Sequence, residues 1–351
     1  WPAVLTTAAV LVETGKPLEM AELAVPPLRT GQVLVAISYS GVCRSQLLEV
    51  GGHRGVDAWV PHCLGHEATG VVHEVGPGVT RVKPGATVVL SWLAGAGTEA
   101  GGSTYTWDGR TVNAGPVTTF QRHAVVSENR LTPLIEGTDP VAAVMLGCAI
   151  PTGFGAVANV AQAQPGETVA VFGVGGVGLC AVIGAVVVGA RPVLAVDVSE
   201  AKLDRARSLG ATRCVLAGEI GQLGEQVRAA ADGPIDVAVE ATGAPGVMAA
   251  ALACVRPRGG RAVIVGNAPR GQDMSIDPSQ LNQGKRLLGT WGGDAVPERD
   301  FPRYQRLLRA GTIDVSSLIE RVYALEEVNI ALQDLEDGRV FRPVLDMASP
   351  R

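Results

Sequence analysis

Apolar and polar positions follow a strand-like pattern in the first part of the chain. Between Gln32 and Val42 apolar residues alternate with other residues, and Ala68 to Val72 is an apolar stretch of strand length. Turn signals such as Gly76-Pro77-Gly78 separate these stretches. Alternation with a period of two is typical of half-buried β-strands, and glycine and proline mark the turns between strands. The pattern therefore predicts that this part of the chain is mostly β.

The pattern changes after Pro165-Gly166, where short apolar runs begin to alternate with segments of helix length. Thr168 to Phe172 and Val193 to Val198 are predicted strands, and a glycine-rich loop and an apolar segment separate them. Two further apolar runs, Ile235 to Glu240 and Arg261 to Val265, continue the alternation, with a predicted helix between them. Strand, helix and strand in this order form a βαβ unit, which predicts a parallel sheet.

The end of the chain is more charged after about Gly289, and Pro302 to Ala310 and Leu325 to Glu336 are predicted helices. A chain of 351 residues exceeds the usual size of one hydrophobic core, so more than one domain is expected. We therefore predict an α/β fold. It has a mostly β part over residues 1–151, a Rossmann-type, doubly wound parallel sheet over residues 152–289, and a further segment, 290–351.

Composition narrows the possible partners. The formal net charge is −5 and no run of Lys and Arg occurs, so no nucleic-acid partner is expected. The most apolar stretch, Leu179 to Ala190, is shorter than the roughly 20 helical residues that span a bilayer, so no membrane partner is expected either. The six cysteines are widely spaced, and Trp1-Pro2-Ala3 begins no visible secretion signal. Reduced thiols and a cytoplasmic location fit this pattern best.

The glycine-rich loop is a candidate cofactor site. Gly173-Val174-Gly175-Gly176-Val177-Gly178 follows a predicted strand and opens a predicted helix. In such a loop the first glycine permits a tight turn, the second lets the backbone approach a pyrophosphate, and the third allows close packing of helix on sheet. The amides at the helix N-terminus then face the anion. An isolated loop of this kind often only turns the chain, but here strand, loop, helix and strand occur in order.

An acidic residue at the end of the next strand favours one cofactor. Asp197 occupies the position from which a carboxylate accepts hydrogen bonds from the adenosine ribose hydroxyls and repels a 2′-phosphate. The sequence therefore favours NAD over NADP. Lys202 follows on the next helix and is placed to reach the same ribose, although a solvated surface lysine is an equally good interpretation.

The candidate metal ligands are Cys43 and His66, which lie at the ends of predicted elements, and Cys148, which lies shortly before Pro151, where the chain passes toward the βαβ part. Catalytic zinc usually has three protein ligands and one open position, and thiolate and imidazole are among its preferred donors. The three residues are far apart in sequence, however, and a lone cysteine is more often a small buried hydrophobic residue. Their chemistry alone leaves both interpretations open.

Four segments together resemble the medium-chain zinc alcohol dehydrogenases. They are Gly41-Val42-Cys43-Arg44-Ser45, Gly65-His66-Glu67-Ala68-Thr69-Gly70, Val75-Gly76-Pro77-Gly78-Val79 and Pro151-Thr152-Gly153-Phe154-Gly155. With the glycine loop they follow the order and spacing of that family over almost the whole chain. The resemblance implies a GroES-like catalytic domain to which residues 290–351 return, and a homodimer.

The same resemblance implies roles for individual residues. It implies that Cys43, His66 and Cys148 bind zinc and that Glu67 is a transient ligand. Ser45 is predicted to accept the substrate proton, because its hydroxyl can both donate and accept. The implied cofactor contacts, besides the glycine loop, Asp197 and Lys202, are Arg44, Thr152, Val265 and Arg342. The implied substrate pocket contains Trp92, Phe120, Asn267 and Trp291.

Departures from the family pattern also carry predictions. The family holds a second, structural zinc in a cysteine-rich lobe that corresponds to Leu93 through Ser103, where this chain has no cysteine. We therefore expect one catalytic zinc per chain and no structural zinc. Gln46 stands where the family commonly has an acidic residue that braces the ligand histidine, so weaker zinc binding is expected. Leu48 replaces a histidine of the proton relay of some relatives, and His53 is a speculative substitute.

The expected activity is that of an NAD-dependent alcohol dehydrogenase, which moves a hydride between an alcohol, or the corresponding aldehyde or ketone, and the nicotinamide. Two alternatives remain at this point. A zinc-free enone or quinone reductase of the same superfamily would use the same cofactor domain, and a non-catalytic NAD-binding protein would explain Gln46 and Leu48 as decay. The identity of the small-molecule substrate does not follow from the sequence.

Overall fold

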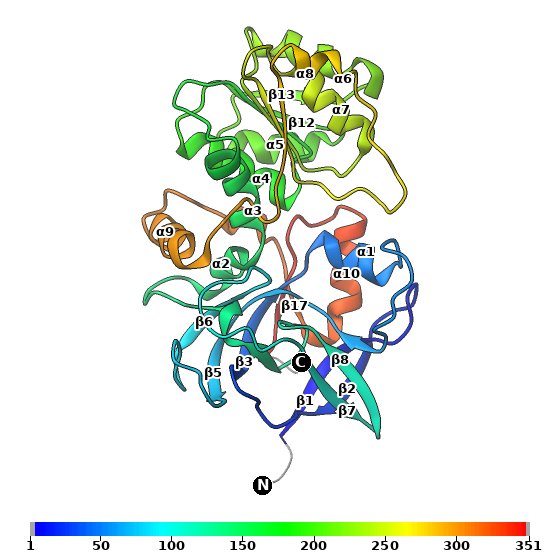
Figure 1. Cartoon of the computed structure of the whole chain (residues 1–351), viewed down its shortest axis with the longest axis vertical. Helices are drawn as coiled ribbons and strands as arrows, with labels where there is room; N and C mark the ends of the chain where they lie inside the picture. The colour runs from blue at the N-terminus through cyan, green and yellow to red at the C-terminus, as the bar shows by residue number, and fades with distance from the viewer. Residues whose placement is uncertain (1–3, 349–351) are drawn as a thin grey trace. The chain divides into compact units, whose positions relative to one another are not determined.

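The computed structural model describes residues 4–348 and divides into two compact units (Figure 1). Unit 1 contains the chain up to Cys148 together with the chain from Val296 onward, and unit 2 is Ala149–Ala295. The sequence placed the boundaries at residues 151 and 289. The last segment joins unit 1 because its strands β17 (Val322–Ala324) and β18 (Val344–Asp346) pair with each other and β18 pairs with β3 (Gln32–Gly41).

Unit 1 contains a small closed barrel of short strands. Its hairpin partners are antiparallel, and alternate side chains of these strands form one apolar cluster that includes Leu23, Tyr105 and Val112. The barrel order is β1 (Leu5–Leu11), β2 (Glu19–Ala24), β7 (Ser103–Trp107), β8 (Arg110–Ala114) and β4 (His62–Cys63).

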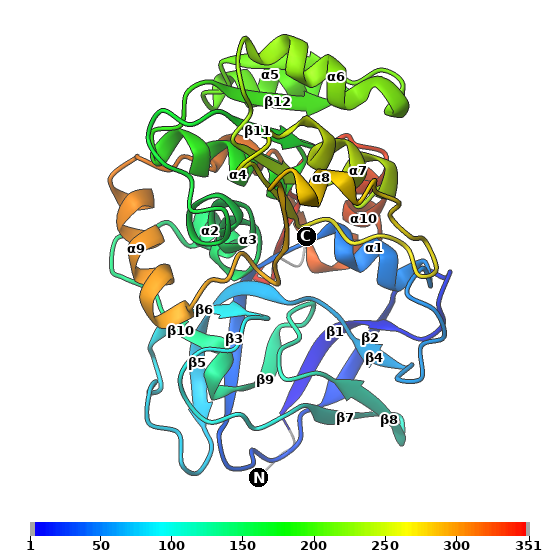
Figure 2. The same ribbon diagram turned by 45° about the horizontal axis from the view of Figure 1, so that its top comes forward.

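A second sheet of unit 1 has β3 at its centre (Figure 2). One face of β3 contributes Val33, Val35 and Ile37 to an apolar core cluster of this unit. The alternation seen in the sequence therefore has the expected cause. The strands of this sheet are β10 (Leu131–Pro133), β6 (Thr87–Ser91), β5 (Glu67–Val75), β3 (Gln32–Gly41), β18 (Val344–Asp346), β17 (Val322–Ala324) and β9 (His123–Ser127).

The helices of unit 1 are short, apart from one that begins earlier than predicted. The helix expected at Pro302 spans Pro297–Arg309, because Pro297 stands at its first position, where a missing N–H costs nothing. Asp300 accepts a hydrogen bond from the Val296 amide (2.8 Å) and completes this first turn. The helices are α1 (Arg44–Val50), α2 (Pro140–Ala143), α9 (Pro297–Arg309) and α10 (Val328–Glu336), with the 3₁₀ turns η1 (Glu128–Arg130), η2 (Val144–Gly147), η4 (Ser316–Leu318) and η5 (Leu325–Glu327).

Unit 2 is the predicted parallel sheet with helices. The strand order is β13-β12-β11-β14-β15-β16, with all neighbours parallel, which is the Rossmann order 3-2-1-4-5-6. The predicted α/β fold class is confirmed. The strands are β11 (Val169–Phe172), β12 (Val193–Asp197), β13 (Arg213–Leu216), β14 (Val237–Glu240), β15 (Arg261–Ile264) and β16 (Arg286–Gly289). The helical segments are α3 (Ala149–Gly155), the π-helical turn η3 (Ala156–Val160), α4 (Gly176–Val187), α5 (Glu200–Ser208), α6 (Ile220–Ala231), α7 (Pro245–Cys254) and α8 (Ser279–Asn282).

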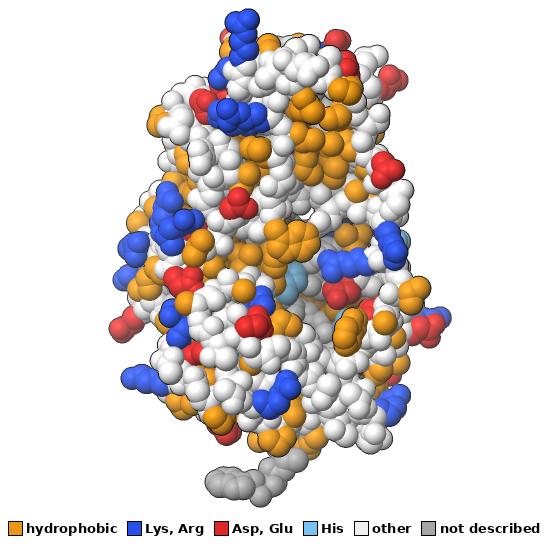
Figure 3. All heavy atoms as spheres, viewed as in Figure 1, with side chains coloured by type: hydrophobic (Ala, Val, Ile, Leu, Met, Phe, Trp, Pro, Cys, Tyr) orange, Lys and Arg blue, Asp and Glu red, His pale blue; other side chains and the backbone are white. Residues whose placement is uncertain are grey.

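Two further observations concern partners. Within residues 4–348 no single helix is both long and apolar enough to cross a membrane, and only a bent pair of short helices, Pro140–Gly147 and Ala149–Val160, reaches that length when both are counted. On the face shown in Figure 3, Lys and Arg side chains lie scattered among Asp and Glu and form no basic stripe.

Candidate metal centre and cofactor loop

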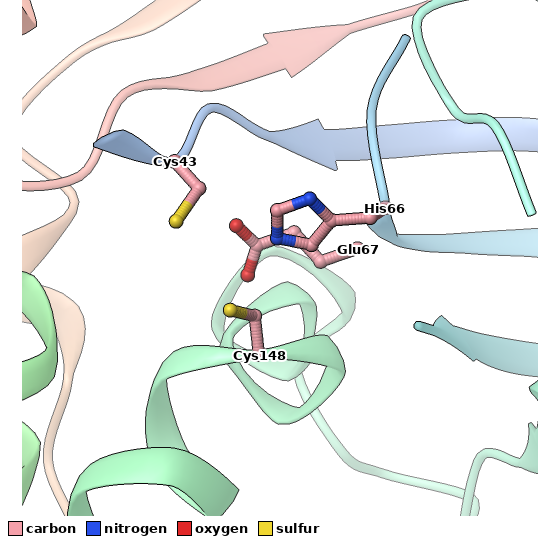
Figure 4. Close-up of side chains that lie close together, drawn as sticks. All are labelled: Cys43, His66, Glu67 and Cys148. Atoms are coloured by element: carbon pink, nitrogen blue, oxygen red, sulfur yellow. The ribbon is translucent and has the colours of Figure 1, made fainter. Parts of the chain in front are cut away.

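Four side chains of unit 1 converge on one point (Figure 4). Cys43 lies between the end of β3 and the start of α1, and Cys148 directly follows η2. His66 directly precedes β5, and Glu67 is the first residue of that strand. One ligand atom from each residue, a sulfur, an imidazole nitrogen or a carboxylate oxygen, lies within 4.8 Å of the others. The structure thus brings together the three residues that the sequence proposes as zinc ligands.

Two glycines allow the backbone to close around Glu67. A Cβ at Gly41 would lie 2.7 Å from the Glu67 carboxyl carbon, and a Cβ at Gly147 would lie 2.6 Å from the Glu67 Cβ. Both distances are shorter than carbon atoms tolerate, so any side chain at either position would displace Glu67. The glycines beside Cys43 and Cys148 therefore fix how closely the two cysteine-bearing segments approach β5.

Gln46 links two of the candidate ligands. It is buried at the third position of α1, and its Oε1 accepts a hydrogen bond from the Cys43 backbone N–H (2.8 Å). This contact is half of a capping box, in which a Gln or Glu side chain reaches back to the residue before the helix. The Gln46 Nε2 lies 2.6 Å from Nδ1 of His66. The bridge leaves Nε2 of His66 as the nitrogen available to a metal.

A buried ion pair borders the cluster. Arg342, which lies just before β18, donates from Nη2 to Oε1 of Glu67 (2.5 Å), and both side chains are almost completely buried. Four buried polar atoms of the pair and of nearby positions in the sequence have no nitrogen or oxygen partner within hydrogen-bonding distance: Glu67 Oε2, Arg342 Nε, His66 Nε2 and the Ser45 hydroxyl. Buried polar atoms are nearly always hydrogen-bonded in folded proteins, so unmatched atoms that converge indicate a ligand site.

Electrostatic interactions within the cluster separate the two thiols. A hydrogen bond from the Cys148 thiol, with help from Arg342 and His66, holds the pKa of Cys43 well below its usual range although burial opposes this. The same hydrogen bond and burial raise the pKa of Cys148. Burial works against a charged His66, but the neighbouring Cys43 sulfur and Glu67 outweigh it and raise the His66 pKa. Of the two thiols, Cys43 is therefore the one that loses its proton more readily.

The donor set fits zinc. Two sulfurs and one imidazole are donors that zinc prefers, and three protein ligands leave the open position of a catalytic site. Nε2 of His66, which has no nitrogen or oxygen partner, is the atom that would coordinate such an ion. Among residues 4–348, this is the one cluster of three or more His, Cys, Asp and Glu residues with metal-binding geometry.

The glycine loop of unit 2 has the conformation that a dinucleotide-binding loop needs. Gly173 has a φ of +81°, which favours glycine. A Cβ at Gly178 would lie 1.9 Å from the Gly173 carbonyl oxygen, so close packing of α4 on the loop requires glycine there. A Cβ at Gly175 would meet nothing within 4 Å, which leaves its backbone open to a ligand.

Asp197 ends β12 beside this loop. Its Oδ2 accepts a hydrogen bond from the Val174 amide (2.9 Å), and its Oδ1 accepts one from the Ser199 amide (3.1 Å). Lys202 Nζ lies 3.9 Å from Oδ1. The acidic residue, the lysine and the loop are thus neighbours, as the cofactor prediction requires.

The other predicted residues lie in varied settings. Thr152 is buried in α3, and Val265 is half-buried directly after β15. Asn267 and Arg44 are exposed, Trp92 is half-buried, and Trp291 follows β16 with 73% of its surface exposed. Phe120 has no exposed surface and packs in the core of unit 1, where its ring faces Gly65. A ring without exposed surface cannot line a pocket in this structure, so we leave Phe120 out of the proposed substrate site.

The Arg342–Glu67 ion pair was not predicted from the sequence. Arg342 was assigned only to the cofactor, and it is separated from Glu67 by 275 positions. No local pattern connects residues at that distance. The available signal was weak: a Glu at the start of a buried strand requires a cation or a metal close by.

The structure combines a Rossmann-type unit with a second unit that carries a cluster of two thiols, one imidazole and one carboxylate. Comparisons identify the family. The chain matches family models described as alcohol dehydrogenase GroES-like domain, over residues 29–136, and zinc-binding dehydrogenase, over residues 176–310. It is 33% identical to S-(hydroxymethyl)glutathione dehydrogenase of Synechocystis sp., in an alignment that covers 96% of this chain and 98% of the relative.

Two solved structures are similar over nearly their full length. An alcohol dehydrogenase zinc-binding domain protein from Burkholderia ambifaria superposes with a TM-score of 0.90 at 28% identity and covers 99% of this chain and 100% of its own. Benzyl alcohol dehydrogenase from Acinetobacter calcoaceticus superposes with a TM-score of 0.87 at 28% identity and covers 98% and 100%. The chain belongs to the medium-chain zinc-dependent alcohol dehydrogenase family, and its class of activity is zinc-dependent alcohol oxidoreduction.

Proposed function

We propose that this protein is an NAD-dependent alcohol dehydrogenase in which Cys43, His66 and Cys148 bind one catalytic zinc. The observation that carries the proposal is the convergence of two sulfurs, one imidazole and one carboxylate within 4.8 Å, together with the unmatched buried atoms His66 Nε2 and Glu67 Oε2. The reaction transfers a hydride between the carbon of an alcohol, or the corresponding carbonyl, and the nicotinamide.

Different residues of unit 1 accept the substrate proton and balance charge. A bound zinc would supply a Lewis acid that lowers the pKa of a coordinated hydroxyl, as it does for water, to about 7. Ser45 accepts the proton that the alcohol releases, because its buried hydroxyl has no protein partner and can both accept and donate. Leu48 offers no further proton acceptor on α1, so the proton leaves from Ser45 toward the cofactor ribose. Arg342 balances the charge of Glu67.

NAD is the proposed cofactor on the strength of Asp197. A carboxylate at the end of the second strand accepts hydrogen bonds from the ribose hydroxyls and repels the phosphate of NADP. The exposed amides of the glycine loop and the N-terminus of α4 would hold the pyrophosphate. Arg44, Thr152, Lys202 and Val265 are proposed as further cofactor contacts.

The proposed substrate is a small-molecule alcohol or carbonyl compound. Two of the relatives are named for hydroxymethylglutathione and benzyl alcohol, which differ in size and polarity. Trp92, Trp291 and Asn267 are the proposed pocket residues of this chain. A homodimer is proposed from the family resemblance, and a cytoplasmic location is proposed because the six cysteines are widely spaced along the chain.

The test compares variants of two proposed zinc ligands with a variant of another buried cysteine of unit 1. Purified protein is expected to contain about one zinc per chain, and Cys43→Ser and His66→Ala are expected to lower alcohol-dependent NADH formation at least a thousandfold, because several kcal/mol of transition-state stabilisation disappear. Cys63→Ala is the control, since Cys63 is buried in the barrel of the same unit. Unchanged turnover in both ligand variants would reject the assignment, and enone reduction by metal-free protein would favour a zinc-free reductase.

A further inference from the structure

Gln46 contacts two of the candidate zinc ligands, and its two contacts cannot both stay the same when zinc is bound. It contacts Cys43 N–H through Oε1 (2.8 Å) and His66 Nδ1 through Nε2 (2.6 Å). The Cys43 backbone can only donate. In this arrangement Nδ1 of His66 must therefore be the acceptor for the amide N–H, and the ring proton must be on Nε2. The amide oxygen and one N–H of the amide are then matched.

Binding a metal through Nε2 reverses the hydrogen-bonding role of Nδ1 of His66. A neutral imidazole that coordinates through one nitrogen carries its proton on the other, so Nδ1 becomes a donor. Gln46 then faces two donors, the Cys43 N–H and the His66 N–H, but only its single oxygen can accept, so both donors must share that oxygen and the NH₂ group loses its partner. Turning the amide over moves the conflict from His66 to Cys43 and does not remove it. Gln46 is 1% exposed, which leaves its NH₂ group little access to water.

We propose that Gln46 makes this zinc site weak and exchangeable, by stabilising the metal-free tautomer of His66 over the tautomer that binds zinc. The inference rests on the proposed zinc site. Gln46 is a positioning residue, because it acts through His66 and touches neither the metal nor the substrate. Its effect comes from the number of hydrogen-bond acceptors at residue 46, which a carboxylate would raise from one oxygen to two.

A single substitution tests whether the amide of Gln46 weakens zinc binding. In Gln46→Glu each donor receives its own carboxylate oxygen, and the zinc dissociation constant, measured by competition with a chromogenic chelator, is expected to fall tenfold or more, since such supporting contacts change metal affinity by about 10- to 100-fold. Glu49→Gln is the charge control. Glu49 lies on the same helix, so this variant changes the charge of α1 without touching His66, and its zinc affinity is expected to stay within about twofold of the wild type.

A spectroscopic measurement on the unmodified protein tests the same idea. Two-dimensional ¹H–¹⁵N spectra of metal-free protein are expected to show His66 with its proton on Nε2, and addition of zinc is expected to move the proton to Nδ1. This measurement does not depend on whether Gln46→Glu folds.

The outcomes distinguish the inference from the zinc assignment. Equal zinc affinity of Gln46→Glu and wild type, or a metal-free His66 already protonated on Nδ1, would overturn the role of Gln46 and leave the zinc site intact. Zinc binding that survives His66→Ala at full affinity would instead overturn the site on which the inference rests.

Discussion

The metal cluster and the loop of residues 92–102, which joins β6 to β7, are each organised by a buried carboxylate in unit 1, but their hydrogen bonding differs. Glu128 accepts hydrogen bonds from the backbone N–H groups of Thr80 and Arg81 (2.7 Å each) through Oε1, and from Thr98 (2.8 Å) through Oε2. Both of its oxygens are matched by fixed donors. In Glu67, Oε1 pairs with Arg342 and Oε2 has no partner.

The two carboxyls also differ in their pKa. Burial opposes the charge of Glu128, but the three backbone N–H groups outweigh it and hold its pKa below the usual range. Burial raises the pKa of Glu67, and Arg342 only partly opposes this effect. A carboxylate whose acceptors are all used stabilises a loop, whereas one with an unused oxygen beside other unmatched atoms indicates a place for a cation.

This contrast explains how the 92–102 loop is held without the cysteines that the family uses there. Besides Glu128, Ser127 Oγ accepts from the Ala100 amide (2.8 Å), and Glu99 accepts from Asn129 Nδ2 (3.0 Å) and from Arg130 (2.6 Å). The loop therefore has side-chain acceptors where relatives have thiolates. The absence of a structural zinc remains a prediction.

Removal of zinc should produce the largest difference between the two regions. Dialysis against a chelator is expected to lower alcohol oxidation at least a thousandfold, because the Lewis acid disappears, and added zinc should restore it. The loop should not respond. Hydrogen exchange at the Thr80, Arg81 and Thr98 amides should stay within about twofold. Faster exchange at those amides after chelation would reveal a second metal in the loop and contradict the contrast.

Substitution of Glu128 should produce the converse result. Glu128→Ala leaves three backbone N–H groups without their acceptor, and loss of hydrogen bonds to a charged group is expected to lower the free energy of unfolding of unit 1 by about 3 kcal/mol. The zinc content should stay at the wild-type value. Glu136→Ala is the control, because Glu136 is exposed and should change stability by less than about 0.5 kcal/mol. Loss of zinc in Glu128→Ala would show that the two regions are not independent.

The sequence predicted the fold where the pattern was local. The strands β11, β12 and β14, with α4 between the first two, follow apolar runs and a glycine loop, and their observed bounds lie close to the predicted ones. β13 and β16 were missed, because each has four residues and begins with an exposed or half-exposed arginine rather than an apolar run. The predicted start of α9 at Pro302 was wrong, because the helix begins at Pro297.

The site was less accessible to sequence reasoning. Nothing periodic connects Cys43, His66 and Cys148, and only the resemblance to a family suggested that they meet. Their convergence depends on long-range register, since β5 pairs Ala68 with Ser40 of β3, close to Cys43. The Glu67–Arg342 pair depends on the return of the C-terminal segment to β3. Such contacts are properties of the folded sheet, and a single sequence does not encode them in neighbouring positions.

Asp197 differs from both Glu128 and Glu67. Its carboxylate accepts hydrogen bonds from backbone donors, as that of Glu128 does, and is nevertheless proposed to bind a ligand. Each of its oxygens accepts one backbone N–H, which leaves lone pairs free for ribose hydroxyls. Asp197→Ala is expected to raise the KM for NAD about tenfold, since a hydrogen bond to a charged group contributes about 1.5 kcal/mol, and to improve the use of NADP relative to NAD. Asp204→Ala, at an exposed position of α5, is the control. An unchanged preference between the two cofactors would mean that both oxygens of Asp197 serve only the loop, as those of Glu128 do, and that the choice of cofactor is made elsewhere.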